Sequence, residues 1–245
     1  MPSVPSRSPA SSAALVVGGA LRAALAVVSP TSCPGCGADD VELCRACRDR
    51  LGAEPSTGVL PAGLAVTTAL RYEHEVRGVV LAWKQGGRSR LSGALAAPFA
   101  RSVRRAAGLA PVVPDLVVAV PPSAAGTRRR GWEPVPHLAS RAGVPLAPGL
   151  LHVGGRSAQK GRDRVARARA GAALVARAGV VSGRRVLLVD DVVTTGATLL
   201  AARGALVGAG ATVVGAACLA VVPLLASGSG GTVLAHAARL PGTIP

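Results

Sequence analysis

An uninterrupted apolar run at residues 186–189 is followed at once by Asp190 and Asp191 and then by a threonine-rich turn. Such a run predicts a strand of a parallel sheet, because a strand covered on both faces shows no alternation of polar and apolar residues. The acidic pair marks the carboxyl end of this strand, where open α/β sheets bind their ligands. The pattern therefore predicts an α/β fold with a ligand site beside Asp190.

The turn after the two aspartates has the composition of a phosphate site. It leads into an apolar helical pattern that begins near Leu199, and backbone N–H groups at the start of a helix attract phosphate. The ionised carboxylates of Asp190 and Asp191 can accept hydrogen bonds from the two vicinal hydroxyls of a ribose. A buried strand followed by a capped helix is the simpler interpretation, but it requires only one Asp or Thr. We therefore predict a sugar-phosphate site that includes Thr194, Thr195, Gly196, Ala197 and Thr198.

Positive charge is concentrated in the later part of the chain. The formal net charge is +16, yet residues 1–75 contain six basic and seven acidic side chains. The other 22 basic and five acidic side chains give residues 76–245 a net charge of +17. All the basic residues except Lys84 and Lys160 are arginines, whose planar guanidinium binds phosphate well. This favours pyrophosphate, nucleotides or nucleic acid as partners, although an arginine-rich proteome would raise the same count without a function.

Four of the five cysteines form two C-x2-C pairs, at Cys33 and Cys36 and at Cys44 and Cys47. Each pair can offer two thiolates to one tetrahedral Zn²⁺, and residues 37–42 can turn the chain back to close the site. Four sulfur ligands leave no open position, so the predicted Zn²⁺ is structural and supplies folding energy to a short segment. Two disulfides in a secreted miniature domain are the alternative, which a cytosolic location disfavours.

A second apolar strand is predicted at residues 116–120, and it leads through two prolines to an arginine cluster. Parallel strands end at one edge of a sheet, so we expect this cluster on the edge that carries Asp190. An anionic leaving group such as pyrophosphate would need positive charge there, whereas a solvated basic loop is the alternative. Trp132 is predicted to be a core residue at a helix start rather than a platform for a base. The cluster and its glycine are Arg128, Arg129, Arg130 and Gly131.

The remaining pattern predicts helices and strands on both sides of these motifs. A linker at residues 52–63 is followed by a strand at 65–72, a helix at 75–83 that ends at Lys84, and a helix at 91–107 with a solvated arginine face. Residues 154–170, which include Gln159, are glycine-punctuated and then basic with helical spacing. This segment is predicted to be a lid over an anion, with a plain surface loop as the alternative.

Two apolar stretches have the hydropathy of membrane or export segments. Residues 13–28 lack a basic lead and a persuasive cleavage site, so they predict an amphipathic helix rather than a signal peptide. Residues 204–235 contain no charge and could span a bilayer, but their glycines favour a helix end, a turn and a buried strand at 211–222. We therefore expect a cytoplasmic protein without membrane insertion.

Taken in order, these motifs resemble the ComF family of competence-associated, type I phosphoribosyltransferase-like proteins. The resemblance covers about residues 20–222 and includes the threonine turn, which is similar to the signature that binds phosphoribosyl pyrophosphate (PRPP). It implies a parallel α/β sheet flanked by helices, with a small N-terminal four-cysteine module similar to a zinc ribbon. The implied divisions are an N-terminal tail and amphipathic helix at 1–28, the zinc module at 29–54, the phosphoribosyltransferase-like domain at 64–222 and a flexible C-terminal tail at 223–245.

The resemblance also implies roles for individual residues. Asp190 and Asp191 would contact the ribose, the loop at residues 194–198 would bind the 5′-phosphate, and Mg²⁺ would accompany PRPP. The implied zinc ligands are Cys33, Cys36, Cys44 and Cys47. The implied anion-binding residues are Arg128, Arg129, Arg130, Gly131, Lys84 and Gln159. The family's usual Arg-Gly-aromatic-Asn-Gln segment here reads Arg130-Gly131-Trp132-Glu133-Pro134, and alanine stands near Ala170 where the family has Asn.

Three functional classes follow from these observations. A phosphoribosyltransferase would displace pyrophosphate from C1 of a phosphorylated ribose through a cationic transition state. A non-catalytic protein would handle single-stranded DNA together with DNA-uptake or processing proteins, with strongly salt-dependent affinity. A regulator would bind PRPP without turnover. The four histidines, His74, His137, His152 and His236, form no recognisable catalytic constellation.

Overall fold

A computed structural model of the chain describes residues 31–85, 87–122, 127–128, 130–152, 174–223 and 235–236. Several predictions fall outside these residues: the N-terminal tail and helix at 1–28, the lid at 154–170 with Gln159, Arg129, and most of the C-terminal tail. Among the described helices, none is both long enough and apolar enough to span a membrane.

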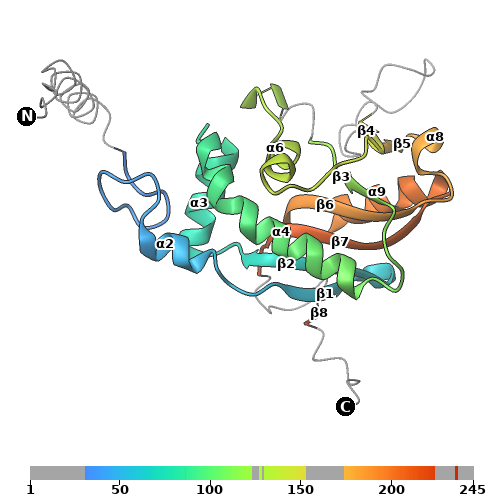
Figure 1. The fold of residues 1–245 in the computed structure, drawn as a ribbon, viewed down its shortest axis with the longest axis horizontal. Helices are drawn as coiled ribbons and strands as arrows, with labels where there is room; N and C mark the ends of the chain where they lie inside the picture. The colour runs from blue at the N-terminus through green and yellow to red at the C-terminus, as the bar shows by residue number, and fades with distance from the viewer. Residues whose placement is uncertain are drawn as a thin grey trace, which may run out of the picture.

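The described part of the chain contains a six-stranded sheet in the order β3-β6-β7-β2-β1-β8. The neighbours β3, β6, β7 and β2 are parallel, as predicted, whereas β1 and β8 extend one side of the sheet in antiparallel pairing (Figure 1). Two further strands, β4 (Leu150–His152) and β5 (Leu174–Ala176), form a separate antiparallel pair. The strands of the main sheet are β1 (Ser56–Leu60), β2 (Leu64–Arg71), β3 (Leu116–Ala119), β6 (Arg185–Val193), β7 (Thr212–Val221) and β8 (Ala235–His236).

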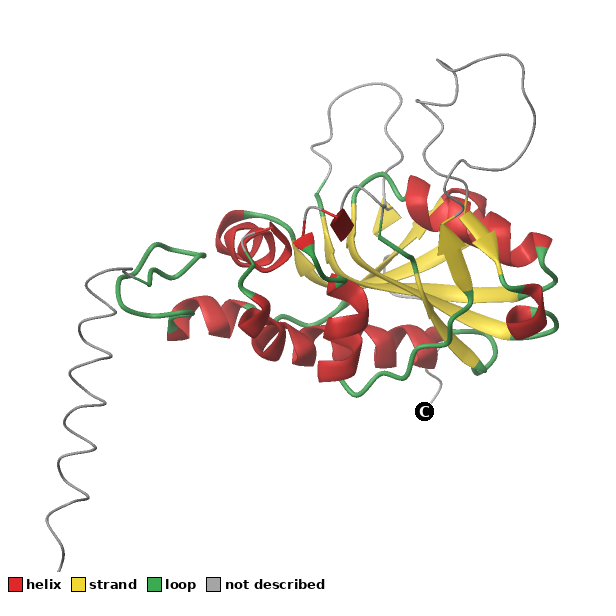
Figure 2. Cartoon of the chain, turned by 90° about the horizontal axis from the view of Figure 1, so that it is seen from above, coloured by secondary structure: helices red, strands yellow, loops and turns green. Residues whose placement is uncertain are grey.

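Helices cover both faces of this sheet (Figure 2). The helices α3 (His74–Gln85), α4 (Ser92–Leu109) and α6 (Pro134–Arg141) pack on one face, and α9 (Ala197–Gly208) packs on the other. The bounds of α3 and α4 confirm the helices predicted at 75–83 and 91–107. The short elements are α2 (Arg45–Arg50), α8 (Ala178–Val181) and the 3₁₀ turns η1 (Pro61–Gly63) and η2 (Ser89–Leu91).

The strand β6 has apolar residues on both faces because it lies between two separate cores. Val186 and Leu188 are fully buried on the side of α9, whereas Leu187 and Val189 are fully buried on the side of α3, α4 and α6. Successive side chains of a strand point to opposite faces, so a strand between two helix layers must be apolar throughout. This confirms the prediction of a central parallel strand at residues 186–189.

One local prediction was wrong, and a second was only partly confirmed. The linker expected at residues 52–63 contains β1, which pairs with β2 through the tight turn η1, where Ala62 and Gly63 have positive φ angles of 61° and 74°. The arginines of α4 were expected to be solvated; Arg104 and Arg105 are exposed, but Arg101 is half-buried and donates a hydrogen bond of 2.7 Å to the Leu51 carbonyl. That carbonyl lies just beyond the cysteine pairs, so Arg101 connects α4 to the front of the chain.

Candidate functional site

The acidic pair lies within the last part of β6, which continues to Val193 rather than ending at the aspartates. Both side chains are half-buried. The alternation of the strand places Asp190 on the face of α9, beside Cys218 of β7, and Asp191 on the face of α3. The two carboxylates therefore flank β6, and the one on the α9 side shares its face with the threonine turn.

Asp191 forms an ion pair with Lys84. The Lys84 Nζ lies 2.8 Å from the Asp191 Oδ1, and the two side chains are only 24% and 14% exposed. Lys84 is in the last turn of α3, 107 residues away in the sequence. Lys84, which was predicted to bind an anion, is thus bonded to Asp191, which was predicted to bind the ribose.

The Asp190 carboxyl retains its proton more strongly than an ordinary aspartate. Burial raises its pKa, the negative charge of Asp191 raises it further, and the net pKa is about 8. The Asp191 N–H donates to the Asp190 Oδ1 at 2.8 Å, and this bond and the charge of Lys84 lower the pKa only in part. A carboxyl with a pKa in this range can exchange a proton near neutral pH, as acid–base groups of active sites do.

The threonine turn joins β6 to α9 and requires its glycine. Gly196 has a φ of 78° and is buried, and a Cβ at this position would lie 2.5 Å from both Cδ atoms of Leu60 in β1. Thr194, Thr195 and Thr198 are exposed around it. The first turn of α9 contains no acidic residue, so the positive end of the helix dipole is not neutralised from within. The turn thus offers hydroxyls and helix N–H groups to an anion.

The arginine cluster follows β3 at the same edge of the sheet. The Val120 N–H donates to the Val189 carbonyl at 2.9 Å, so the end of β3 lies directly beside Asp190. Arg128 is exposed, whereas Arg130 is half-buried and its buried Nε has no hydrogen-bond partner among the described residues. Gly131, with a φ of 72°, closes this segment by donating to the Thr127 carbonyl at 2.8 Å.

Trp132 packs as the predicted core residue ahead of a helix. Its ring meets the rings of Trp83 and His137 edge to face, with centroids 5.8 Å and 5.5 Å apart. Helix α6 begins two residues later at Pro134, a position where proline is well tolerated. The Trp132 ring therefore packs against side chains of α3 and α6.

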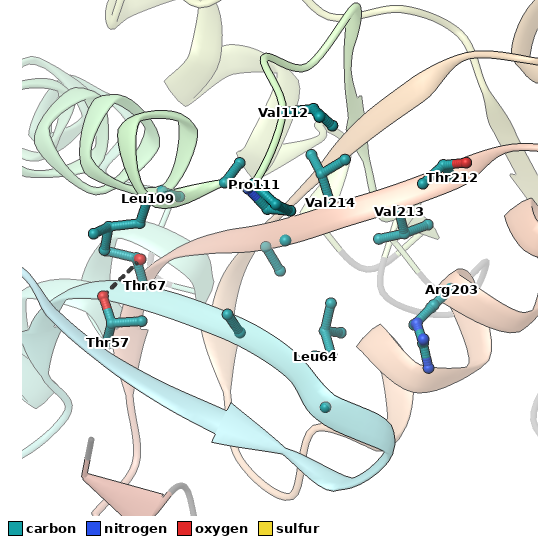
Figure 3. A pocket seen from close by; sticks show the side chains of 16 residues that line it. Thr57, Leu64, Thr67, Leu109, Pro111, Val112, Arg203, Thr212, Val213 and Val214 are labelled. Carbon is teal, nitrogen blue, oxygen red and sulfur yellow. Dashed lines mark hydrogen bonds between the residues drawn. The ribbon is translucent and has the colours of Figure 1, made fainter. Parts of the chain in front are cut away.

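Two of the cavities that are lined by described residues lie at opposite edges of the sheet. A pocket of about 450 Å³ adjoins the end of β3 and is lined by residues 119–122, Glu133, Pro136 and residues 146–150. Sequence reasoning identified no such pocket, although the many prolines of its walls are visible in the sequence. A second pocket of about 270 Å³ lies beside the amino end of β7, where the Thr57 and Thr67 hydroxyls are hydrogen-bonded at 2.9 Å (Figure 3). Of these two pockets, the first borders the edge that carries Asp190.

The four predicted metal ligands are gathered into one cluster. The sulfur atoms of Cys33, Cys36, Cys44 and Cys47 all lie within 4.8 Å of one another, and the Sγ atoms of Cys36 and Cys44 are 3.5 Å apart. Four thiolates at about 2.3 Å from a tetrahedral Zn²⁺ would be about 3.8 Å apart, so the cluster fits such an ion. All four are free thiols, which does not match the disulfide alternative.

Backbone N–H groups favour the thiolate form of Cys33, whereas burial and the neighbouring thiols raise the pKa of Cys47. The Cys44 N–H donates to the Cys33 Sγ at 3.5 Å, and the Cys47 N–H donates to the Cys44 Sγ at 3.4 Å. Burial raises the pKa of the Cys33 thiol, but bonds from the backbones of Cys36, Cys44 and Gly35 outweigh it and lower the pKa to about 6. The thiolate is the form that binds metals.

Comparison with known proteins assigns the class of this domain. Residues 114–233 match the family model described as the phosphoribosyl transferase domain. The matched segment runs from β3 through β6, the threonine turn and α9 to β7, and so includes the acidic pair and the arginine cluster. The chain therefore contains a phosphoribosyltransferase-like domain with a cysteine cluster in front of it. No curated protein matches the sequence.

Two solved structures show partial similarity. One is titled the structure of the allosteric regulatory enzyme of purine biosynthesis; it is 26% identical, and the alignment covers 52% of this chain and 26% of that one, with a TM-score of 0.31. The other is adenine phosphoribosyltransferase from Leishmania donovani, which is 17% identical, with coverage of 63% and 78% and a TM-score of 0.32. Because both TM-scores are low, the assignment depends on the family match and the site.

Proposed function

We propose that the carboxyl edge of the sheet binds PRPP or a closely related phosphorylated pentose. The observation that carries this proposal is the continuous unit of β6, the threonine turn and α9. It combines a carboxyl group, Asp190, with a turn of hydroxyls and helix N–H groups on one face of the sheet. A ribose 5-phosphate has the matching chemistry, because its hydroxyls donate hydrogen bonds and its phosphate accepts them.

In this proposal the 5′-phosphate occupies the turn at residues 194–198, where it accepts bonds from the start of α9. The ribose hydroxyls donate to the Asp190 carboxylate, whereas Asp191, on the opposite face of β6, is bonded to Lys84. Asp190 must lose its proton to accept two hydrogen bonds, so ligand binding and deprotonation are linked at this residue. The pyrophosphate lies toward the end of β3, at Arg128, Arg129, Arg130 and Gly131, with Gln159 as a further anion-binding residue, whereas Lys84 acts through its bond to Asp191.

The reaction that fits this arrangement is displacement of pyrophosphate from C1 of the ribose by an acceptor. The bond from C1 to the pyrophosphate oxygen breaks with its electron pair leaving on that oxygen, and a bond from C1 to the acceptor forms. The carboxylates of Asp190 and Asp191 are hard oxygen donors that fit Mg²⁺, which would neutralise charge on the departing phosphates when bound. The arginine cluster would add fixed positive charge where negative charge develops.

We propose that the cysteine cluster binds one structural Zn²⁺. The four thiols satisfy its preferred ligand number and leave no open coordination position, so the ion would stabilise the front of the chain. Metal analysis of the purified protein should give one zinc per chain. Less than one zinc, with the thiols free, would refute this assignment.

A second candidate function is the handling of single-stranded DNA in competence, in keeping with the resemblance to the ComF family. The observation that favours it is the net charge of +17 on residues 76–245. Basic surfaces of this kind bind nucleic acid by releasing counterions, so the affinity would fall steeply with salt. In that case the turn and the acidic pair would hold a nucleotide or a strand end.

The experiment is calorimetry with PRPP and Mg²⁺ beside gel shifts on single-stranded DNA at two salt concentrations. We expect the wild-type chain to bind PRPP and the double variant Asp190→Asn, Asp191→Asn to lose this binding while it remains folded. Asp49→Asn is the matched control, because Asp49 is an exposed carboxylate of α2. Unchanged affinity in the double variant would overturn the site assignment, and DNA binding without PRPP binding would favour the second function.

A further inference from the structure

The cysteine module, defined as residues 31–51, packs directly on α3. The contact is so close that a Cβ at Gly78 of α3 would lie 2.0 Å from the Pro34 carbonyl oxygen, and one at Gly35 would lie 2.6 Å from the Cys47 Sγ. Only glycine at position 78 allows this approach. The loop that carries Cys33 and Cys36 therefore rests on the middle of α3, where α2 and α3 lie side by side (Figure 1).

Polar and apolar contacts fix the module on both sides of Gly78. Arg88 donates to the Ser32 carbonyl at 2.7 Å, and Arg50 lies 3.4 Å from the Glu75 carboxylate of α3. The buried side chains of the module do not form a core of their own but join the core of the domain. Leu43, Cys47 and Leu51 belong to the same buried cluster as Val79, Trp83 and Phe99.

The other end of α3 carries the ion pair with β6. Lys84 follows Gly78 by six residues, or about 9 Å along the helix axis. Trp83 is fully buried between these points, and its Nε1–H donates to the buried Ser92 Oγ at 2.8 Å. Helix α3 is thus held along its length, with the cysteine module at its middle and the bond from Lys84 to Asp191 at its end.

We propose that the cysteine module is a positioning element for the sugar-phosphate site. By packing through Gly78 it holds α3 so that Lys84, a positioning residue, stays bonded to Asp191. A segment this short depends on its metal for folding energy, so metal loss would release one side of α3 and loosen this bond. Metal binding and ligand binding would then be coupled in both directions. The expected effect on PRPP binding rests on the proposed function, whereas the link from the module to Lys84 does not.

The link can be measured without a ligand, because Lys84 and Lys160 are the only lysines of the chain. The full chain loaded with Zn²⁺ is treated briefly with an acetylating reagent, and modification at each lysine is measured by mass spectrometry. We expect metal removal by a chelator to raise the rate at Lys84 several-fold, and added Zn²⁺ to restore it. Lys160 serves as the internal reference, and Asp191→Asn gives the rate of an unpaired Lys84.

Two pairs of variants test the same link while the metal is retained. Gly78→Ala forces the module away from α3, whereas Gly93→Ala places a methyl group in open space on α4. Arg88→Gln removes the bond to Ser32, whereas Arg90→Gln changes an exposed neighbour. The first member of each pair should raise Lys84 acetylation and the second should not. Cys218, which is fully buried in β7, must stay unreactive toward a thiol reagent, because its reaction would indicate general unfolding.

The outcomes separate the two proposals. Unchanged Lys84 reactivity after chelation and in Gly78→Ala, with faster reaction in Asp191→Asn, would overturn the link. Faster reaction at Lys84 with Cys218 still protected supports it, even if PRPP does not bind. If PRPP binds, Zn²⁺ removal followed by transfer into chelator-free buffer with Mg²⁺, and Gly78→Ala, should each weaken PRPP binding by about 5- to 150-fold, the usual range of coupling between two sites.

The role of Lys84 itself is tested by the pH profile of PRPP affinity. The charge of Lys84 lowers the pKa of Asp190, so Lys84→Ala should shift the midpoint of the profile to higher pH. Lys84→Arg keeps the charge and should restore the midpoint. A loss of affinity at every pH with the same midpoint would contradict a positioning role toward the acidic pair.

Discussion

Partial burial and the negative charge of the neighbouring Asp191 raise the pKa of Asp190. Its pKa in the folded protein, about 8, is above that of an exposed aspartate. A raised pKa stabilises the folded state at pH values below the ordinary pKa, and this contribution is lost as the pH rises through about 8. We therefore expect the wild-type melting temperature to fall from about pH 4 to about pH 8, and the neutral side chain of Asp190→Asn to remove much of this fall.

Differential scanning calorimetry of the two proteins at several pH values measures this effect. Asp49→Asn controls for the loss of an exposed carboxylate and should follow the wild-type curve. Parallel curves for wild type and Asp190→Asn would contradict the raised pKa.

The same residue sets the expected pH dependence of ligand binding. Only the ionised carboxylate of Asp190 accepts hydrogen bonds from both ribose hydroxyls, so one proton must leave when PRPP binds. Below its pKa the affinity should rise about tenfold per pH unit and then level off above it. Titration calorimetry in two buffers with different ionisation enthalpies measures the released proton. Binding without proton release between pH 7 and pH 8 would exclude a ribose contact through Asp190.

At the scale of elements, the turn between β6 and α9 depends on the conformation and size of Gly196. Its positive φ disfavours any L side chain, and a methyl group would contact Leu60 at 2.5 Å. Gly196→Ala should lower the free energy of unfolding by about 1–2 kcal/mol and weaken PRPP binding, because the left-handed conformation and the contact with β1 both oppose a side chain. Urea unfolding monitored by circular dichroism gives the free energy.

Gly204→Ala in the same helix is the matched control for Gly196→Ala. Gly204 has open space around its Cβ position and lies within α9, so alanine there should stabilise the protein by about 0.5–1 kcal/mol. Equal effects of the two substitutions would show that the turn has no special requirement for glycine.

At the scale of the whole molecule, two buried cores lie on opposite faces of one sheet. The core under α3, α4 and α6 includes the buried residues of the cysteine module, and the core under α9 does not. Metal removal should therefore increase amide hydrogen exchange in residues 31–51 and in α3, while β6, α9 and β7 keep their protection. Hydrogen exchange with mass spectrometry measures this. Faster exchange in α9 to the same degree as in α3 would contradict the separation of the two cores.

Much of the fold was predictable because its main signals are local. The run at 186–189 indicated a strand between two helix layers, the spacing of Cys33, Cys36, Cys44 and Cys47 indicated one cluster, and Trp132 was expected in the core. The strand β1 was missed because residues 52–63 have the composition of a linker, and their pairing with β2 depends on a tight turn with positive φ angles.

The sequence by itself determined the central strand, the threonine turn after it and the grouping of the four cysteines, because periodicity and short spacing are properties of neighbouring residues. Only the tertiary structure decided that Lys84 is bonded to Asp191 and that the cysteine module rests on Gly78. These contacts join segments that are distant in the chain, and they exist because α3 packs between the module and the sheet.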